Sequence, residues 1–144
     1  SYAIKPQFEL ARNFTEGLAL VRANGKWGYV DTNGKMAIPA RYDIAGPFSG
    51  GLAHVMIDGR YGYIDKRGNV TIKPQFAYAS PFSEDMAFVE MNGKWGYIDK
   101  QGAMRIANRY DSAYRFQNGL ARVALGDNIG YVDRTGVLVW YPTK

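Results

Sequence analysis

Residues 25–31 read GKWGYVD, and this stretch decides the fold because it returns along the chain. Residues 59–65 read GRYGYID, residues 93–99 read GKWGYID, and residues 127–133 read DNIGYVD. Each stretch begins 34 residues after the one before it, with no insertion or deletion. A fixed spacing of this length is typical of a tandem repeat built from one small supersecondary unit.

The periodicity extends outward from this stretch on both sides. Rows of identical residues with the same spacing are Phe14, Phe48, Phe82 and Phe116; Val21, Val55, Val89 and Val123; and Gly34, Gly68, Gly102 and Gly136. They divide the chain into copies at about 14–47, 48–81, 82–115 and 116–144, with 1–13 as a partial leading copy. We interpret residues 1–144 as a single repeat domain.

Composition narrows the classes of function. The chain has no Cys, which excludes a disulfide framework and thiolate chemistry. No apolar run is long enough to cross a membrane as a helix. The net charge is +5, but Lys and Arg are dispersed, and so we do not expect a nucleic-acid partner.

Turn signals predict short antiparallel strands in every copy. Asn24-Gly25 is a strong hairpin signal, because both residues tolerate positive φ. It joins predicted strands at 18–23 and 26–31. A second turn, Asp31 to Gly34, leads to a third strand at about 35–38, where Pro39 should limit further pairing. The trailing segment 42–47 then crosses to the next copy.

Strand alternation separates two faces of the first predicted strand. One face is small and apolar in every copy, beginning with Ala19 and Val21, and is predicted to be core. The opposite face varies between copies at Leu20, His54, Phe88 and Arg122, which suggests a weaker packing constraint. In the second strand, the recurring Gly28 suggests that a bulky ring or another backbone lies over it.

One unit cannot cover its own apolar face, so neighbouring units must stack. The predicted fold class is therefore all-β, with tandem 34-residue repeats of antiparallel hairpin or meander units. We favour an open stacked array over the alternative of a small four-bladed propeller-like ring. The apolar end, Val137 to Tyr141, should pair within the molecule or join another copy of the chain.

Catalytic and metal-binding residues are not apparent. His54 is the only histidine and occurs in one copy, with no nucleophile and carboxylate spaced around it. The recurring Asp31, Asp65, Asp99 and Asp133 offer one carboxylate per turn, which suits turn formation better than a calcium site. Glu84-Asp85 reads as loop. We expect no enzyme activity, no bound metal and no cofactor.

The sequence resembles the WG-containing, or KWG, β-repeat family over nearly its whole length. The resemblance is carried by residues 25–31 and 93–99, whereas Tyr61 and Ile129 replace the Trp in the second and fourth copies. It implies a β-rich module without a general enzymatic activity. Such repeats are common in bacterial proteins as surface, periplasmic or appended modules.

These observations favour a non-catalytic bacterial module that binds a protein or glycan at the cell envelope. A periplasmic, cell-surface or secreted location would follow. The alternatives are a structural subunit that self-assembles through its terminal strands and, behind both, an enzyme of unrecognised type. The candidate ligand-binding residues are the recurring rings Trp27, Tyr61 and Trp95 and the variable positions Leu20, His54, Phe88 and Arg122.

Overall fold

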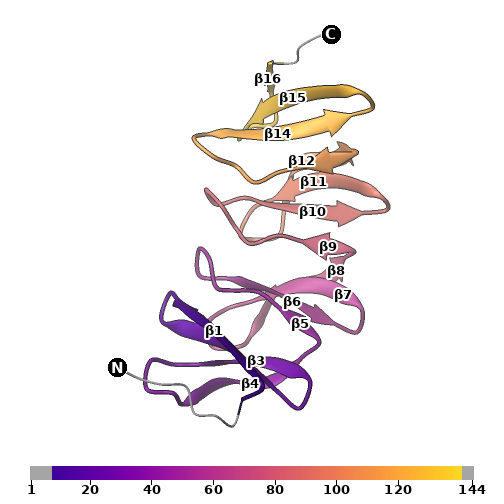
Figure 1. Ribbon diagram of the computed structural model, residues 1–144. Coiled ribbons are helices and arrows are strands. Elements are labelled where there is room, and N and C mark those ends of the chain that lie inside the picture. Colours follow the sequence, from indigo (N-terminus) through magenta and orange to yellow (C-terminus); the bar gives the residue numbers. More distant parts are fainter. Residues whose placement is uncertain (1–7, 141–144) are drawn as a thin grey trace. The chain divides into compact units, whose positions relative to one another are not determined.

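The computed structural model describes residues 8–140, and among these residues there is no helix. The strands form four open antiparallel sheets of four strands each (Figure 1). The first two sheets consist of β1 (Leu10–Thr15), β2 (Leu18–Ala23), β3 (Lys26–Val30) and β4 (Met36–Tyr42), then β5 (Ile44–Ala45), β6 (Ala53–Ile57), β7 (Arg60–Ile64) and β8 (Val70–Phe76). The last two consist of β9 (Tyr78–Ala79), β10 (Ala87–Met91), β11 (Lys94–Ile98) and β12 (Met104–Tyr110), then β13 (Ser112–Ala113), β14 (Leu120–Leu125), β15 (Asn128–Asp133) and β16 (Leu138–Trp140). The predicted all-β class with tandem antiparallel units is confirmed.

The chain divides into two compact units, Ser1–Pro74 and Gln75–Lys144. The first unit holds sheet β1–β4 and most of sheet β5–β8, and the second holds sheets β9–β12 and β13–β16. Each unit therefore contains one odd-numbered copy of the repeat followed by one even-numbered copy. We predicted a single domain, arranged as an open stacked array or, alternatively, as a ring. These statements depend on how the two units are arranged relative to each other, and they stay predictions.

Both turns of the repeat form as the sequence predicts. Asn24 and Gly25 have φ of 54° and 79°, which closes the hairpin between β2 and β3. At the second turn, one carboxylate oxygen of Asp31 accepts hydrogen bonds from the backbone N–H groups of Asn33 and Lys35, at 2.9 and 3.0 Å. The same pair of bonds is made by Asp65, Asp99 and Asp133. The recurring carboxylates therefore hold turns.

In the first two copies the third strand continues past its proline, contrary to our expectation. Strand β4 extends through Pro39 to Tyr42, because the chain bulges there: Trp27 pairs with Tyr42, and Tyr29 with Ile38. Since β4 lies at the edge of its sheet, the missing N–H of Pro39 breaks no ladder. The bulge passes directly over Gly28, where an added Cβ would lie 2.6 Å from the Ala40 nitrogen. Of the two expected alternatives, a bulky ring or another backbone, the structure places the backbone of β4 over Gly28.

The trailing segment is a fourth strand that the sequence analysis did not predict. After Tyr42, β5 crosses to the next sheet and pairs with β6, Ala45 facing Val55. Strands β9 and β13 repeat this arrangement. Each later sheet therefore starts a few residues before the corresponding sequence copy, and two copies of the repeat are joined through one sheet.

Two faces of each sheet can be distinguished by their recurring residues. We call the side that carries Tyr29, Tyr63, Tyr97 and Tyr131 the tyrosine face, and the side that carries Val21, Val55, Val89 and Val123 the valine face. In the first unit, the tyrosine face of sheet β1–β4 packs on the valine face of sheet β5–β8, joining Leu18 and Tyr29 with Val55 and Ile64 in one cluster. These two faces are therefore buried against each other.

Within each unit, a tyrosine of the first sheet and a phenylalanine next to the second sheet pack against each other and hold the two sheets together. The ring of Phe48 meets Tyr29 edge to face at 4.9 Å, and the Tyr29 hydroxyl donates a 2.6 Å hydrogen bond to the Gly46 carbonyl. In the second unit, Phe116 meets Tyr97 at 5.0 Å, and the Tyr97 hydroxyl donates to the Tyr114 carbonyl at 2.7 Å. Burial raises the pKa of both hydroxyls, so they remain neutral donors.

Phe14 differs from the other members of its row. Phe48, Phe82 and Phe116 are at most 4% exposed, whereas Phe14 is 38% exposed. The reason is its place in β1, a six-residue edge strand that pairs with β2, whereas the later phenylalanines follow the short crossing strands. The 34-residue spacing of the phenylalanines is therefore exact in the sequence, but Phe14 does not share the buried environment of the other three.

Candidate functional site

The predicted site residues differ widely in exposure. On the tyrosine face, Leu20 is buried, His54 and Phe88 are half-buried, and Arg122 is exposed. Of the recurring rings, Trp27 and Trp95 are half-buried and Tyr61 is only 7% exposed. The rings therefore do not form one exposed row, and the variable positions require closer inspection.

A groove in the first unit brings two of these variable positions together. We call it the first groove; its volume is about 440 Å³. It is lined by Arg12, Asn13, Thr15 and Leu20 of the first sheet and by Ala45, Gly46, Pro47 and His54 of the second. Three polar side chains of edge strand β1 form one part of the wall, and Leu20, the segment 45–47 and His54 form the rest. Pockets of this size and mixed lining are typical of sites for small ligands or short segments.

The local structure of β1 explains the polar wall. The pairing of β1 with β2 shifts between Ala11 and Phe14, which adds one residue to β1 and marks a bulge. Bulges at sheet edges redirect side chains and end regular pairing. Arg12 and Asn13 lie in this bulge, and both line the groove.

Arg12 is a positioned and uncompensated cation. Its guanidinium carbon lies 5.7 Å from the centre of the Trp27 ring, a cation–π contact that holds the side chain against the sheet. Among residues 8–140 it makes no ion pair, while the nearby acids Glu9 and Glu16 are occupied by Arg22 and Lys66. Arg12 is therefore available for an anionic or strongly polar ligand group.

His54 lies in a low-polarity environment. Its ring stands where a side chain on residue 46 would be, since a Cβ on Gly46 would lie 1.9 Å from its Cε1 atom. Tyr61 lies 5.9 Å away between ring centres, and the Nδ1 atom makes no hydrogen bond to any described residue. Burial lowers the pKa of His54 to about 4, so the imidazole is neutral at neutral pH.

Acidification should therefore destabilise the fold through His54. The unfolded chain takes up this proton below pH 6.5, whereas the folded chain resists it until about pH 4. The free energy of unfolding is expected to fall by about 3 kcal/mol across this window, since each pKa unit corresponds to about 1.4 kcal/mol. Urea unfolding between pH 7 and pH 4 measures the slope. In His54→Leu, which copies the residue at this position in the first copy, the slope above about pH 5 should disappear, whereas carboxylates with a lowered pKa such as Glu16 keep a slope below it. An unchanged slope above about pH 5 would assign it to other groups.

A second candidate surface lies in the second unit, on the tyrosine face of sheet β9–β12. The predicted Phe88 and Trp95 come together with Tyr78, a residue that the sequence analysis missed. Ring centres are 6.2 Å apart for Tyr78 and Phe88, 5.5 Å for Tyr78 and Trp95, and 5.7 Å for Phe88 and Trp95. Tyr78 is 36% exposed, so one ring of the cluster is open to solvent.

Arg122 is paired with another residue that sequence reasoning missed. Its guanidinium carbon lies 5.4 Å from the ring centre of Tyr114, which is 53% exposed. Tyr114, in the third copy, stands at the position of Gly46 in the first copy and of Arg12 in the partial leading copy. This row reads Arg, Gly, Ser and Tyr at positions 12, 46, 80 and 114, and this variation was the available signal for the site.

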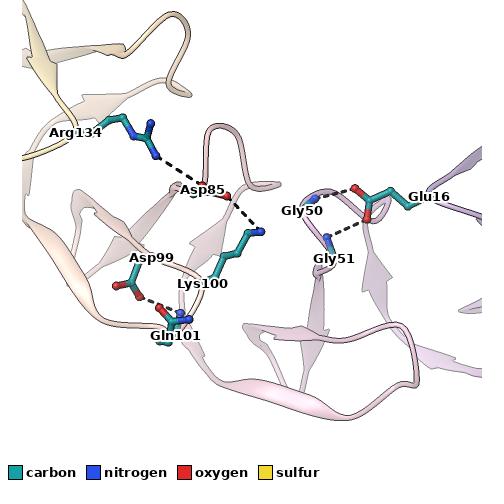
Figure 2. A network of polar contacts seen from close by, with 8 residues as sticks. All are labelled: Glu16, Gly50, Gly51, Asp85, Asp99, Lys100, Gln101 and Arg134. Atoms are coloured by element: carbon teal, nitrogen blue, oxygen red, sulfur yellow. Dashed lines mark hydrogen bonds and ion pairs between the residues drawn. The ribbon is translucent and has the colours of Figure 1, made fainter.

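Carboxylate clamps join the two copies within each unit. Glu16 accepts hydrogen bonds from the backbone N–H groups of Gly50 and Gly51, both at 2.9 Å (Figure 2). Partial burial raises the pKa of Glu16, but these bonds and Lys66 outweigh that effect and hold it below its usual value. Glu84 makes the equivalent clamp to Asn118 and Gly119, at 2.5 and 2.8 Å. Glu84 is thus a loop residue with a stabilising role.

The clamps reveal a second, longer period of two repeats. The first and third copies carry Glu16 and Glu84, whereas the second and fourth carry Gly50 and Asn118 at that position. Ion pairs follow the same rule, with Lys26 bound to Asp43 and Lys94 to Asp111. In the second unit, Asp85 adds bridges to Lys100 and Arg134, at 3.3 and 3.7 Å (Figure 2). Two successive copies span 68 residues, and one such pair of copies corresponds to each compact unit.

Two other kinds of feature are absent from the part of the chain that the structure describes, a metal-binding cluster and a membrane-spanning helix. Among residues 8–140, no group of three or more His, Asp or Glu side chains is arranged to hold a metal ion. The same residues contain no helix of the length and hydropathy needed to cross a membrane. Strand β16 pairs with β15 inside the molecule; Tyr141, which we grouped with it, lies outside the described residues.

The fold and the grooved, clamped sheets define a class of protein: a tandem-repeat β module whose four-stranded sheets resemble propeller blades. Similar solved structures are a eukaryotic initiation factor (12% identity, TM-score 0.66, 99% of this chain and 47% of that one) and KlHsv2 with loop 6CD replaced by a Gly-Ser linker (10%, 0.64, 95% and 53%). BamB from Moraxella catarrhalis is similar as well (15%, 0.57, 87% and 46%). These neighbours have propeller-like folds, and the chain spans about half the length of each.

The family follows from the sequence itself. The pattern of the WG containing repeat matches four consecutive segments, residues 2–27, 27–61, 61–95 and 95–128. The chain therefore belongs to the WG-containing repeat family, as the resemblance implied. Among curated proteins, no sequence matches it.

Proposed function

We propose that this chain is a non-catalytic module that binds a protein or glycan partner through the first groove. The observation that carries the proposal is the meeting of Leu20, His54 and the unpaired Arg12 in one groove of about 440 Å³. Apolar walls with a few convergent polar groups suit either a sugar ring or a peptide side chain. We also propose a location at the bacterial envelope, on the strength of the family resemblance.

The groove combines the contacts that such a ligand needs. Arg12, Asn13 and Thr15 supply donors along one edge strand, and Leu20 and Pro47 supply apolar surface. The corresponding positions of the second unit are bulkier, with Phe88 in place of Leu20 and Tyr114 in place of Gly46. The two units therefore offer different binding surfaces on the same scaffold, and we assign the partner to the first.

Removing Arg12 should weaken binding without harming the fold. A hydrogen bond to a charged group contributes about 1.5–3 kcal/mol, so Arg12→Ala should raise the dissociation constant roughly tenfold or more. A glycan array and a displayed peptide library identify the partner class, and titration calorimetry on the best hit measures the loss. Leu20→Phe, which introduces the third copy's residue, should also weaken binding by narrowing the groove.

Arg109→Ala is the matched control. Arg109 lies over the ring of Tyr110 at 5.3 Å, much as Arg12 lies over Trp27, but it is outside the first groove. This variant removes the same charge and the same kind of contact. If Arg109→Ala weakens binding as much as Arg12→Ala, or if neither groove variant has an effect, the partner does not use the first groove.

A further inference from the structure

The ring cluster of Tyr78, Phe88 and Trp95 includes a carboxylate that no cation among the described residues compensates. Glu90 lies directly across from Tyr78 on β9 and from Trp95 on β11. It projects from the same face of β10 as Phe88, two residues before it, and it is half-buried. Among residues 8–140 its side chain makes no ion pair and no hydrogen bond. The cluster therefore combines three rings with one uncompensated negative charge.

Two cations in the same sheet are engaged elsewhere. Lys94 pairs with Asp111 at 2.6 Å, and Arg109 lies over the ring of the tyrosine that follows it, 5.3 Å from the ring centre. In the part of the chain that the structure describes, no Lys or Arg side chain lies over the ring of Phe88 or of Trp95. The molecule itself therefore supplies no cation to the rings of these two residues or to Glu90.

Of the four described sheets, only sheet β9–β12 has three rings and an acid at these positions. The corresponding residues are Leu10, Leu20, Arg22 and Trp27 in sheet β1–β4, Ile44, His54, Met56 and Tyr61 in sheet β5–β8, and Ser112, Arg122, Ala124 and Ile129 in sheet β13–β16. The first sheet even has an arginine where the third has Glu90. Because the other sheets form without this combination, the repeat fold does not require it.

We propose that Tyr78, Phe88, Trp95 and Glu90 form a second binding site, which takes the quaternary ammonium group of a small choline-type solute. Ring faces attract cations that lie within about 6 Å of the ring centre, and aromatic clusters bind quaternary ammonium groups for this reason. Ring centres that are 5.5–6.2 Å apart allow one such group to contact more than one ring. Glu90 supplies the balancing negative charge.

The polar groups of the cluster favour a methylated cation over an amine. A primary ammonium has three N–H donors and a guanidinium has five, and each donor needs an acceptor. The rings of Phe88 and Trp95 offer none, which leaves Glu90 as the only carboxylate of the cluster. A quaternary ammonium has no N–H group, and its methyl groups pack on the rings. The solute should carry no carboxylate beside its ammonium, since Glu90 would repel it.

The surroundings of the cluster favour a solute over a lipid surface. Lys94 precedes Trp95 on β11, and both side chains of the ion pair between Lys94 and Asp111 are exposed. An exposed ion pair beside the rings places the cluster at a surface in contact with water. We therefore assign the site to a free solute.

Choline chloride and two analogues test the site in the intact, isotope-labelled chain. The indole N–H signal of Trp95, identified by its loss in Trp95→Phe, is followed by nuclear magnetic resonance. We expect choline to shift this signal saturably and to leave the Trp27 signal in place, because the Trp27 ring already holds Arg12. Dimethylbutanol, the uncharged carbon analogue of choline, and ethanolamine, which lacks the methyl groups, should each bind at least tenfold more weakly.

Glu90→Gln tests the role of the charge. This variant keeps the size of the side chain, and it should weaken choline binding at least fivefold. Asp58→Asn is the matched control, because it removes an exposed carboxylate from a hairpin turn of the first unit and introduces the residue that the first and third copies have there. It should leave choline binding unchanged. Circular dichroism checks that both variants are folded.

Four results would overturn the proposal. A Trp95 signal that choline does not shift would exclude the site, and equal binding of choline and dimethylbutanol would reduce it to an apolar patch. Equal losses in Glu90→Gln and Asp58→Asn would assign the effect to the net charge of the chain. Sedimentation with phosphatidylcholine vesicles that Glu90→Gln abolishes would assign the site to a lipid head group. None of these results bears on the first groove, because no residue of the proposed site lines it.

Discussion

Gly96→Ala is expected to lower the free energy of unfolding by about 3 kcal/mol or more, although it adds only one methyl group. A Cβ on Gly96 would lie 2.6 Å from the Ile106 carbonyl oxygen and 2.7 Å from the Asn108 nitrogen. These are backbone atoms of β12, which cannot rotate away as a side chain would. The strand must move, and its pairing with β11 is lost. Urea unfolding followed by circular dichroism measures the change.

Gly93→Ala separates steric conflict from the conformational preference of glycine. A Cβ on Gly93 meets no atom within 4 Å, but the residue has φ of 82°, which disfavours alanine. The expected cost is only about 1–2 kcal/mol, from the left-handed backbone alone. If the two variants are equally unstable, the close approach of β12 over Gly96 is not what the WG motif requires.

Features that depend on neighbouring residues in the chain could be predicted from the sequence. The hairpin at Asn24-Gly25 and the Asp31 turn need only local backbone chemistry, and both have the expected form. A close approach over Gly28, by a ring or by another backbone, was also foreseen, because a strand glycine that returns in every copy needs a steric reason; the structure shows the backbone. The family and the all-β class follow from the same local regularities.

Features that depend on distant partners could not be predicted in the same way. Strand β5 has two residues, too few for a periodic pattern, and exists only because β6 pairs with it. Pro39 was read as a strand end because the bulge opposite Gly28 leaves no mark in β4 itself. The 68-residue period was visible in Trp27 and Trp95, but the role of Glu16 became clear only from its bonds to the next copy.

The candidate site shows the same division. Leu20 and His54 were selected because their positions vary on a repeated face, and the structure brings both to the first groove. Arg12 was not selected, because it lies in the partial leading copy, where β1 has a bulge that no other copy repeats. Variation among the copies therefore predicted which face of the sheet carries the candidate site. The charged residue of the groove could not be predicted in this way, because Arg12 lies in the irregular strand β1.

Tyr97→Ala is expected to be the second highly destabilising change, lowering the free energy of unfolding by about 4 kcal/mol. The ring is fully buried between the two sheets of the second unit, and its loss leaves a cavity beside Phe116. Tyr97→Phe keeps the ring and removes only the hydrogen bond to the Tyr114 carbonyl, so it should cost about 1 kcal/mol. Urea unfolding of the two variants separates packing from hydrogen bonding.

A double-mutant cycle then measures how directly the two rings support each other. Phe116→Ala should cost about 3 kcal/mol alone, and the double variant with Tyr97→Ala should cost less than the sum by about 1 kcal/mol, since both deletions remove the same edge-to-face contact. If the two losses of stability add exactly, the sheets are held together by the surrounding aliphatic residues and not by the contact between the Tyr97 and Phe116 rings. In that case the Phe row would owe its 34-residue spacing to the loop that carries it, because Ser83 in one loop donates a 2.8 Å hydrogen bond to the Phe116 carbonyl in the next.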